Sequence, residues 1–307
     1  MSAMVSTAPE VADRLAQLPK LGVGLSFQGP LKRFVEEQSD AFDFLEVIPD
    51  SLWTDRGPEV EPRYQEHVDT RDFLARVAER KPLIAHSIGL SIGSVDHFNR
   101  AHIEQIASWW QRYGFPWHSD HLSFNRLDHP TGHTMDVGFT MPVPYDQEVL
   151  DLLVERVNEM QARVPVPFLL ENNVYYFEIP EQDMDEATFL NRLTERTGCG
   201  LLLDLHNIHV NATNHGFDPR DLLSGLDLSR VVEIHIAGGM TLAGVYMDAH
   251  SGPCPPEVWQ LLREVLPQTP NLRGVVFEVF AGYAKAMGFE AIGAQLAQAR
   301  DIVHRHL

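Results

Sequence analysis

The 307-residue chain has few of the features that mark several large classes of protein. It contains only two cysteines, Cys199 and Cys254, which excludes a disulfide scaffold and favours a reducing cytoplasm as its location. No apolar run approaches the roughly 18 residues that a membrane span needs. The first twenty residues also lack the apolar segment of a signal peptide. We therefore expect no association with a membrane.

Positive charge is scarce as well. The chain has 24 Lys and Arg against 43 Asp and Glu, a net charge of −19, and its basic residues form no cluster. An acidic surface repels the phosphates of nucleic acids unless bound metal ions reverse the local potential. The sequence also has no Gly-x-Gly-x-x-Gly motif after its first predicted strand, and no phosphate-binding loop. Nucleic-acid binding and an open nucleotide-binding sheet, the runner-up fold, are therefore disfavoured.

What the sequence does have is a regular alternation of two kinds of segment. Eight short apolar segments predict strands, at 21–27, 43–48, 82–87, 116–123, 166–173, 200–210, 231–236 and 274–280. Helices are predicted between and after them, at 30–38, 66–80, 97–113, 146–163, 185–197, 218–226, 255–266 and 291–304. The pattern predicts an α/β fold, a single (β/α)8 TIM barrel over 21–307, preceded by a tail or short helix over 1–20. Loops are expected at 51–65 and 125–144.

Side chains that can bind a metal stand at the C-terminal ends of six consecutive predicted strands. They are His86, Asp120 with His121, Glu171, Asp204 with Asn207, His235 and Glu278, and Asp248 and His250 follow in the loop after the seventh strand. These strand ends meet at the active face of a TIM barrel. A lone histidine or aspartate is more often a packing or helix-capping residue, so the metal-site hypothesis rests on their convergence.

The chemistry of this set points to metal ions. Imidazole and carboxylate without thiolate suit Fe, Mn or Zn and disfavour Ca or a structural zinc. The donors are too many for one ion, so two or three ions are expected, with carboxylates such as Glu171 bridging them. Two-metal sites catalyse hydrolysis and isomerisation, whereas iron sites with open positions react with oxygen. Ligand type alone leaves these reactions open.

Several motifs, spread in order over nearly the whole chain, carry a resemblance to a known family. The most specific are His-Ser-Ile-Gly-Leu-Ser-Ile-Gly at 86–93, Asn-His-Gly-Phe-Asp-Pro at 214–219 and Asp-Ala-His at 248–250. Thr-Gly-Cys-Gly-Leu-Leu-Leu-Asp at 197–204 supports them. The chain resembles the multinuclear non-haem iron-dependent oxidative enzymes, a family typified by the methanobactin maturation enzyme.

The resemblance implies a function and a ligand set. It implies an enzyme that uses O2 to modify a Cys, Asn or Asp residue of a ribosomally synthesised precursor peptide, with a separate partner protein that binds the leader segment. Two or three irons in mixed Fe(II)/Fe(III) states would be the cofactor, with Glu171, Asp204 and His235 at the catalytic centre. The family's residue order assigns the ligands to His86, the Asp120/His121 pair, Glu171, Asp204, Asn207, His235, Asp248, His250 and Glu278. The alternative is a divalent-metal barrel hydrolase or isomerase, of the sugar isomerase or phosphodiesterase type.

For a few residues the sequence leaves two roles open. His206 stands where the family more commonly has asparagine, and it is either an extra ligand or a donor to one. Glu46 either orients a ligand or pairs with a basic residue inside the barrel, and we favour the first. Cys254 either faces the site or is an ordinary loop thiol, which we favour, and Cys199 is expected to pack in the core. Surface positions are expected for His67, His97, His102, His304 and His306. The 125–144 segment either caps the mouth and contacts a peptide or is solvated surface.

Overall fold

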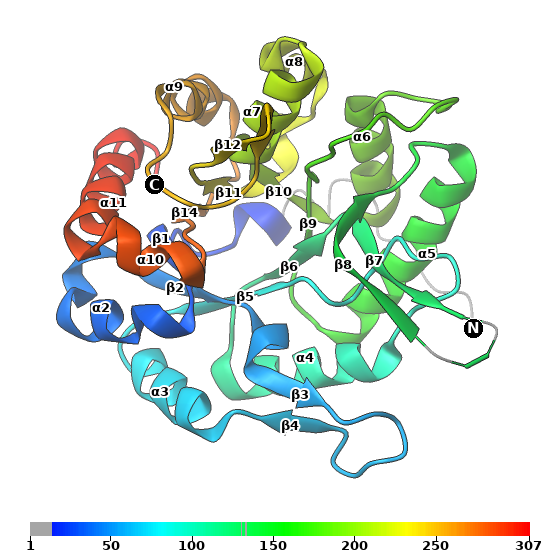
Figure 1. The fold of residues 1–307 in the computed structure, drawn as a ribbon, viewed down its shortest axis with the longest axis horizontal. Coiled ribbons are helices and arrows are strands. Elements are labelled where there is room, and N and C mark those ends of the chain that lie inside the picture. The colour runs from blue at the N-terminus through cyan, green and yellow to red at the C-terminus, as the bar shows by residue number, and fades with distance from the viewer. Residues whose placement is uncertain (1–13, 130, 133) are drawn as a thin grey trace.

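The computed structural model describes residues 14–129, 131–132 and 134–307. Its centre is a closed barrel of eight parallel strands, which confirms the predicted fold (Figure 1). In barrel order they are β1 (Gly22–Phe27), β2 (Phe44–Val47), β5 (Leu83–Ser87), β6 (His118–His121), β9 (Phe168–Glu171), β10 (Gly200–Asp204), β11 (Val231–Ile236) and β14 (Gly274–Phe277). The tail predicted over 1–20 remains a prediction, because residues 1–13 lie outside the described part.

Helices surround the barrel as an outer layer (Figure 1). They are α2 (Lys32–Glu37), α3 (Val68–Ala78), α4 (Arg100–Tyr113), α5 (Gln147–Arg163), α6 (Glu186–Thr197), α7 (Leu205–His215), α8 (Pro219–Gly225), α9 (Pro256–Val265), α10 (Ala281–Met287) and α11 (Phe289–Val303). Short 3-10 turns add η1 (Gly29–Leu31), η2 (Ser39–Ala41), η3 (Pro49–Leu52), η4 (Leu228–Arg230) and η5 (Leu266–Gln268). Local sequence sets several boundaries: Asp146 and Asp185 cap α5 and α6, and Gly114 ends α4 in a left-handed conformation. None of the described helices is long and apolar enough to cross a bilayer.

Apolar side chains fill one end of the barrel interior. A separate core cluster consists of Leu15, Phe44, Ile84, Trp117, Leu169, Leu202, Val232 and Val276. Phe44 needs glycine neighbours, because a Cβ added at Gly24 would lie 2.5 Å from its ring and one at Gly274 would lie 2.8 Å away. This layer leaves the opposite end, where the strands finish, for the polar side chains of the interior.

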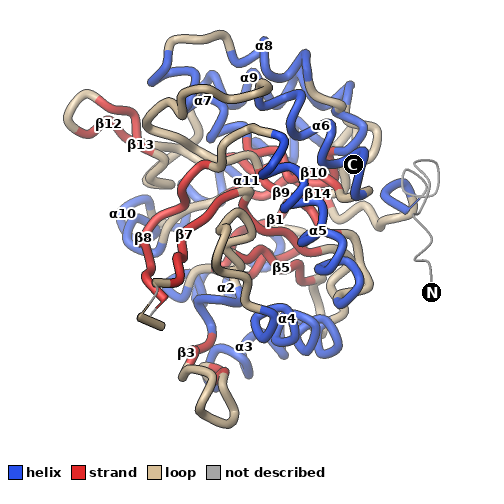
Figure 2. The backbone as a smooth tube through the Cα atoms, turned by 90° about the vertical axis from the view of Figure 1, so that its right-hand side faces the viewer, coloured by secondary structure: helices blue, strands red, loops and turns tan. Residues whose placement is uncertain are grey.

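Three antiparallel hairpins extend from the strand ends. They are β3 (Trp53–Asp55) with β4 (Tyr64–Glu66), β7 (Ser123–Asp128) with β8 (Thr134–Pro142), and β12 (Met240–Leu242) with β13 (Val245–Met247). The prediction of plain loops at 51–65 and 125–144 is therefore wrong. β3, β4 and β8 are largely half-buried or exposed, and the buried positions of β7 are the polar Ser123 and Asn125, so no buried apolar alternation reveals these hairpins. Figure 2 shows β7–β8 and β12–β13 projecting on the same side of the barrel.

The sixth strand is shorter than predicted. It ends at Asp204, whose Oδ1 accepts the N–H of Asn207 at 2.7 Å and so caps α7. His206, Asn207 and His209 consequently lie on a helix and not on a strand, because an aspartate cap starts a helix even after a buried strand. The eighth strand likewise ends early, and the helix α10 that follows it was not predicted.

Candidate metal centre

The first group of donors comes from three neighbouring strands. His86, His121 and Glu171 face the barrel interior, and their ligand atoms lie within 4.8 Å of one another. Glu171 Oε2 is 2.9 Å from His121 Nδ1 and 3.3 Å from His86 Nε2. The ring of His86 is oriented by a hydrogen bond of 2.9 Å between its Nδ1 and Ser119 Oγ, which leaves Nε2 directed at the group.

His235 is the centre of a second group. Its Nε2 is hydrogen-bonded to Glu46 Oε2 at 2.9 Å, and its Nδ1 lies 3.0 Å from Glu278 Oε2. His235 also forms a triplet with Glu171 and Asp204, in which the three ligand atoms lie within 4.8 Å of one another. His235 therefore connects the first group to the rest of the mouth.

A third group comes from α7 and from the loop after β13. Asp248 Oδ1 lies 2.9 Å from His206 Nδ1 and 2.8 Å from His250 Nε2. His250 has a φ of +43°, in the left-handed region that costs a non-glycine residue energy. His250 also forms a triplet with Asp204 and Glu278, so the three groups make one continuous donor network.

The geometry of the short contacts separates two kinds of interaction. His121 Nδ1, His235 Nδ1 and His250 Nε2 each lie within 3.0 Å of a carboxylate oxygen. Yet none of these nitrogens has a hydrogen-bond partner among the described residues, because the angles are wrong. A metal ion requires several ligand atoms within reach of one point, and the three ligand atoms of each donor triplet lie within 4.8 Å of one another. The residues therefore fit bound metal.

Burial and neighbouring charges shift the pKa values of the network in both directions, and the histidines lower the pKa of Glu171, Asp248 and Glu278. Burial raises the pKa of Glu46 to about 8, and burial also raises the pKa of Asp204 well above its usual range. Burial lowers the pKa of His86 to about 3. Burial opposes the charge of His121 too, but the Glu171 carboxylate outweighs it and raises the pKa of His121 to about 9. Several buried carboxylates in one space call for positive charge among them.

The structure brings together eight of the ten predicted ligands. They are His86, His121, Glu171, Asp204, His235, Asp248, His250 and Glu278. Asn207 lies beside them: its Nδ2 donates to Glu171 Oε1 at 3.2 Å and to the Asn172 carbonyl at 3.0 Å. Asp120 does not join them, because alternation along β6 turns it outward, where its Oδ2 accepts the N–H of Leu90 at 3.3 Å.

The sequence alone left the role of two residues of the network open. His206 and Glu46 both contribute ligand atoms to the donor triplets. The sequence could have predicted the place of Glu46 in the network, because this residue lies at an inward position of a buried strand. His206 could not be predicted in this way, since its place on α7 depends on where β10 ends.

Histidines and cysteines outside the network are partly as expected. His67, His304 and His306 are exposed, as predicted. The surface prediction is wrong for two others: His97 pairs with Asp128 and His102 pairs with Asp50, both at 2.9 Å and both buried. His102 shares one face of α4 with other buried residues, a helical spacing that the sequence contains.

Both cysteines are buried and neither forms a disulfide. Burial raises the pKa of the Cys254 thiol well above its usual range, which disfavours the reactive thiolate. The backbone N–H of Cys254 donates to Gln295 Oε1 at 2.9 Å, which fixes this residue in the packed layer below α11. These contacts support the ordinary loop thiol over a reactive one.

Solved structures with a similar fold reach across nearly the whole chain. Endonuclease IV from Thermus thermophilus matches with a TM-score of 0.55 and 16% identity, covering 94% of this chain and 100% of that one. The IolI protein with a bound zinc atom gives a TM-score of 0.57 and 15% identity, over 93% and 99%. D-psicose 3-epimerase from Clostridium cellulolyticum gives 0.52 and 15%, over 92% and 91%. At this identity the likeness shows the TIM-barrel fold alone.

Sequence relatives are more similar. A UPF0276 protein of Rhizorhabdus wittichii is 35% identical over 223 residues, which cover 72% of this chain and 73% of the relative. A UPF0276 protein of Caulobacter vibrioides is 32% identical over 241 residues, 78% of this chain and 80% of the relative. Residues 22–299 match the model of a family described as RiPP precursor modification enzymes MbnB/TglH/ChrH, where RiPP denotes a ribosomally synthesised and post-translationally modified peptide. The chain therefore belongs to this family of peptide-modifying enzymes, as its motifs predicted.

Proposed function

We propose that the chain is a multinuclear non-haem iron enzyme that uses O2 to modify oxidatively a Cys, Asn or Asp residue of a ribosomally made precursor peptide. The observation that carries the proposal is the continuous network of imidazole and carboxylate donors at the barrel mouth, in which five triplets each have their ligand atoms within 4.8 Å of one another. Membership of a family that modifies precursor peptides supports the substrate class.

Two or three irons in mixed Fe(II)/Fe(III) states would supply Lewis acidity toward the substrate heteroatom and electrons for the reduction of O2. His86, His121 and Glu171 would hold one ion. Asp204, His235 and Glu278 would hold a second, with Glu171 near enough to be shared. Asp248 and His250 would hold a third. Nitrogen and oxygen donors without thiolate suit iron, and the buried Cys254 stays outside the donor groups.

Other residues would position these ligands. The Nε2–H of His235 donates to Glu46, which fixes the ring and leaves Nδ1 for a metal. Asn207 holds one oxygen of Glu171, and Ser119 orients His86. His206 Nδ1 meets Asp248 in hydrogen-bond geometry, unlike the contact from His250. We therefore assign His206 as a positioning residue for Asp248, one of the two roles that its sequence context left open.

The surface around the mouth is suited to peptide and protein contacts. Large apolar side chains are exposed on the segments that follow the strands, namely Met135, Phe139, Tyr176, Phe177, Met240, Leu242, Val245 and Phe280. Exposed apolar residues gathered on one rim commonly mark interaction sites. We assign this rim to the precursor peptide and to a separate partner protein that binds its leader. Conversion of the peptide at full rate by the chain alone would contradict the partner.

One experiment separates this function from the alternatives. The protein is purified without oxygen, its metals are quantified, and O2 uptake is followed when a candidate peptide from a neighbouring gene is added. We expect more than one iron per chain and peptide-dependent O2 uptake. Zinc or manganese without O2 uptake would favour a barrel hydrolase or isomerase. Bound metal with no turnover of any substrate would favour a non-catalytic metal-binding role.

A further inference from the structure

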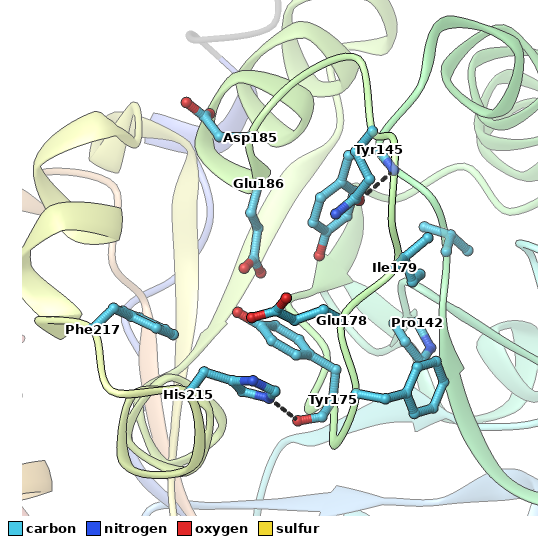
Figure 3. Close-up of a pocket in the computed structure, with 12 residues that line it drawn as sticks. Pro142, Tyr145, Tyr175, Glu178, Ile179, Asp185, Glu186, His215 and Phe217 are labelled. Atoms are coloured by element: carbon cyan, nitrogen blue, oxygen red, sulfur yellow. Dashed lines mark hydrogen bonds between the residues drawn. The ribbon is translucent and has the colours of Figure 1, made fainter.

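A separate cavity of about 340 Å³ lies beside the barrel mouth. Its walls come from the loop between β9 and α6, the segment before α5, the start of α6 and the end of α7 (Figure 3). Aromatic and acidic side chains dominate these walls: Tyr145, Tyr175, Phe177, Phe217, Glu178, Asp185 and Glu186. The lining residues that the structure describes include neither lysine nor arginine.

Glu186 is the unusual member of this lining. Its Oε1 is buried and has no hydrogen-bond partner among the described residues. Burial raises the pKa of Glu186 to about 7, and the hydrogen bond from the neighbouring Tyr145 hydroxyl opposes this shift. Glu186 is half-buried as a residue, but a buried carboxyl oxygen without a partner is costly unless something else satisfies it.

Apart from the Tyr145 hydroxyl, the neighbouring polar groups are engaged elsewhere. Asp185 is occupied as the cap of α6, since its Oδ1 accepts the N–H of Thr188 at 2.7 Å. The Nε2–H of His215 donates to the Tyr175 carbonyl at 3.1 Å. Figure 3 shows the carboxyl groups of Glu178 and Glu186 directed toward the same part of the cavity as the Tyr145 hydroxyl, with Asp185 set apart. Two carboxyl groups therefore face one space, and the described residues that line it include no basic side chain to pair with them.

The surroundings select the type of cation. A hard metal ion such as Ca²⁺ needs six to eight oxygen ligands, many more than this cavity directs inward. Aromatic rings instead stabilise ammonium and guanidinium groups over their faces, and a buried carboxylate adds a charged hydrogen bond. Tyr145 is 8% exposed and so belongs to a fixed wall, not to a mobile surface.

We propose that this cavity binds a lysine or arginine side chain of the precursor peptide and anchors it next to the reacting residue. The identity of the peptide as the occupant rests on the proposed function, whereas the binding of an organic cation does not. The loop after Glu171 supports the placement. Its Tyr176 hydroxyl accepts the N–H of Asp248 at 2.9 Å, and the adjacent Tyr175 and Phe177 line the cavity. A chain anchored here would lead directly to the donor network.

Binding can be tested without metal or turnover. The full chain is titrated with three capped glycine pentapeptides that carry lysine, arginine or uncharged norleucine at the centre, and binding is measured by calorimetry and by NMR of the peptide. We expect the lysine or the arginine peptide to bind at millimolar concentration and the norleucine peptide to bind at least about tenfold more weakly, as loss of a charged hydrogen bond predicts. Equal binding of all three, or binding of none, would overturn the cation site.

Matched variants locate the site. Glu186→Gln keeps the shape of the side chain and should weaken the cationic peptides by about tenfold or more. Glu195→Gln, on the exposed face of the same helix, should leave binding unchanged. Should Glu186→Gln fail to fold, as judged by circular dichroism, Glu178→Gln on the exposed rim should give a smaller loss in a folded protein. Unchanged binding in a folded Glu186→Gln protein, or in Glu178→Gln where it serves as the substitute, would overturn the assignment.

The result is independent of the iron chemistry. A protein that binds the cationic peptides but holds no iron and consumes no O2 would keep the cation site and refute the proposed function. A protein that oxidises its peptide, and does so equally well when every lysine and arginine of that peptide is replaced by norleucine, would refute the peptide as the occupant.

Discussion

The donor network has two halves that the fold supports differently. His86, His121, Glu171, Asp204 and His235 extend from barrel strands that are hydrogen-bonded on both sides, and Glu278 directly follows such a strand. The group around Asp248 instead comes from the first turn of α7 and from a loop, where His250 has a positive φ. Rigid strands fix a ligand more accurately than loops do. The strand half should therefore hold metal firmly, and the loop half should lose it first.

The largest effect is expected when a ligand that the two halves share is substituted. Asp204 belongs to triplets on both sides, so Asp204→Asn should remove more than one metal and lower peptide-dependent O2 uptake by about a thousandfold or more. Metal analysis and oxygen electrodes measure both changes. Asp120→Asn is the control, because burial raises the pKa of Asp120 well above its usual range and asparagine resembles the neutral acid. Similar losses in both variants would contradict the shared role.

Removing a ligand from the loop half alone should have a narrower result. His250→Ala takes away one side of the contact to Asp248, and alanine leaves the cost of the positive φ in place. We expect the loss of about one metal per chain while the strand half keeps its ions, together with reduced turnover. Anaerobic metal analysis at increasing chelator concentration checks this order. Simultaneous loss of all metal would show that the two halves form a single unit.

The positioning role of His206 predicts a smaller change. His206→Asn shortens the side chain and removes the hydrogen bond to Asp248, but it leaves Asp248 and His250 in place. The affinity for the most weakly held metal should fall about 10–100-fold, the usual effect of losing a partner behind a ligand. Competition with a chelator measures it. Complete loss of that metal at saturating concentration would instead identify His206 as a direct ligand.

The last prediction concerns the two faces of β6 and changes the stability of the fold, with no direct effect on the metal ligands. His121 faces the network, whereas His118 faces the outer layer and stacks on Phe168 with ring centroids 4.8 Å apart. Burial lowers the pKa of His118 to about 3, so the unfolded chain binds an extra proton below the ordinary histidine pKa of about 6.5. The free energy of unfolding should therefore fall as the pH drops from about 6.5 toward 3, by up to about 1.4 kcal/mol per pH unit from this residue.

Denaturant titration across this range measures the slope. His118→Phe keeps an aromatic ring against Phe168 and carries no titrating group, so it should flatten the dependence between those two pH values. An unchanged slope would assign the acid sensitivity to other groups.

The sequence predicted the strand half of the site well, for a physical reason. Side chains alternate along a strand, so a polar residue at the end of a buried run points either to the interior or to the helices. The sequence placed Glu171, His235 and Glu278 correctly at the mouth, and their role as ligands remains a proposal. It left the Asp120/His121 pair ambiguous because the exact start of β6 decides which of the two faces inward.

The loop half was less predictable. Its geometry depends on where β10 stops and α7 begins, and on hairpins whose exposed residues carry no apolar alternation. His97 and His102 were misplaced because their acidic partners lie in distant segments. The cavity around Glu186 gave no sequence signal at all, since it forms only when the loop after β9 packs against Tyr145 and α7.

The apolar layer around Phe44 and Trp117 gives the barrel a single open end. Under the proposed function, oxygen, peptide and product would all pass through this one opening, and the modified peptide would have to leave before the next one binds. A partner that grips the leader segment tightly would consequently slow each cycle at its exit step. Raising partner concentration beyond saturation of binding would then bring no further speed.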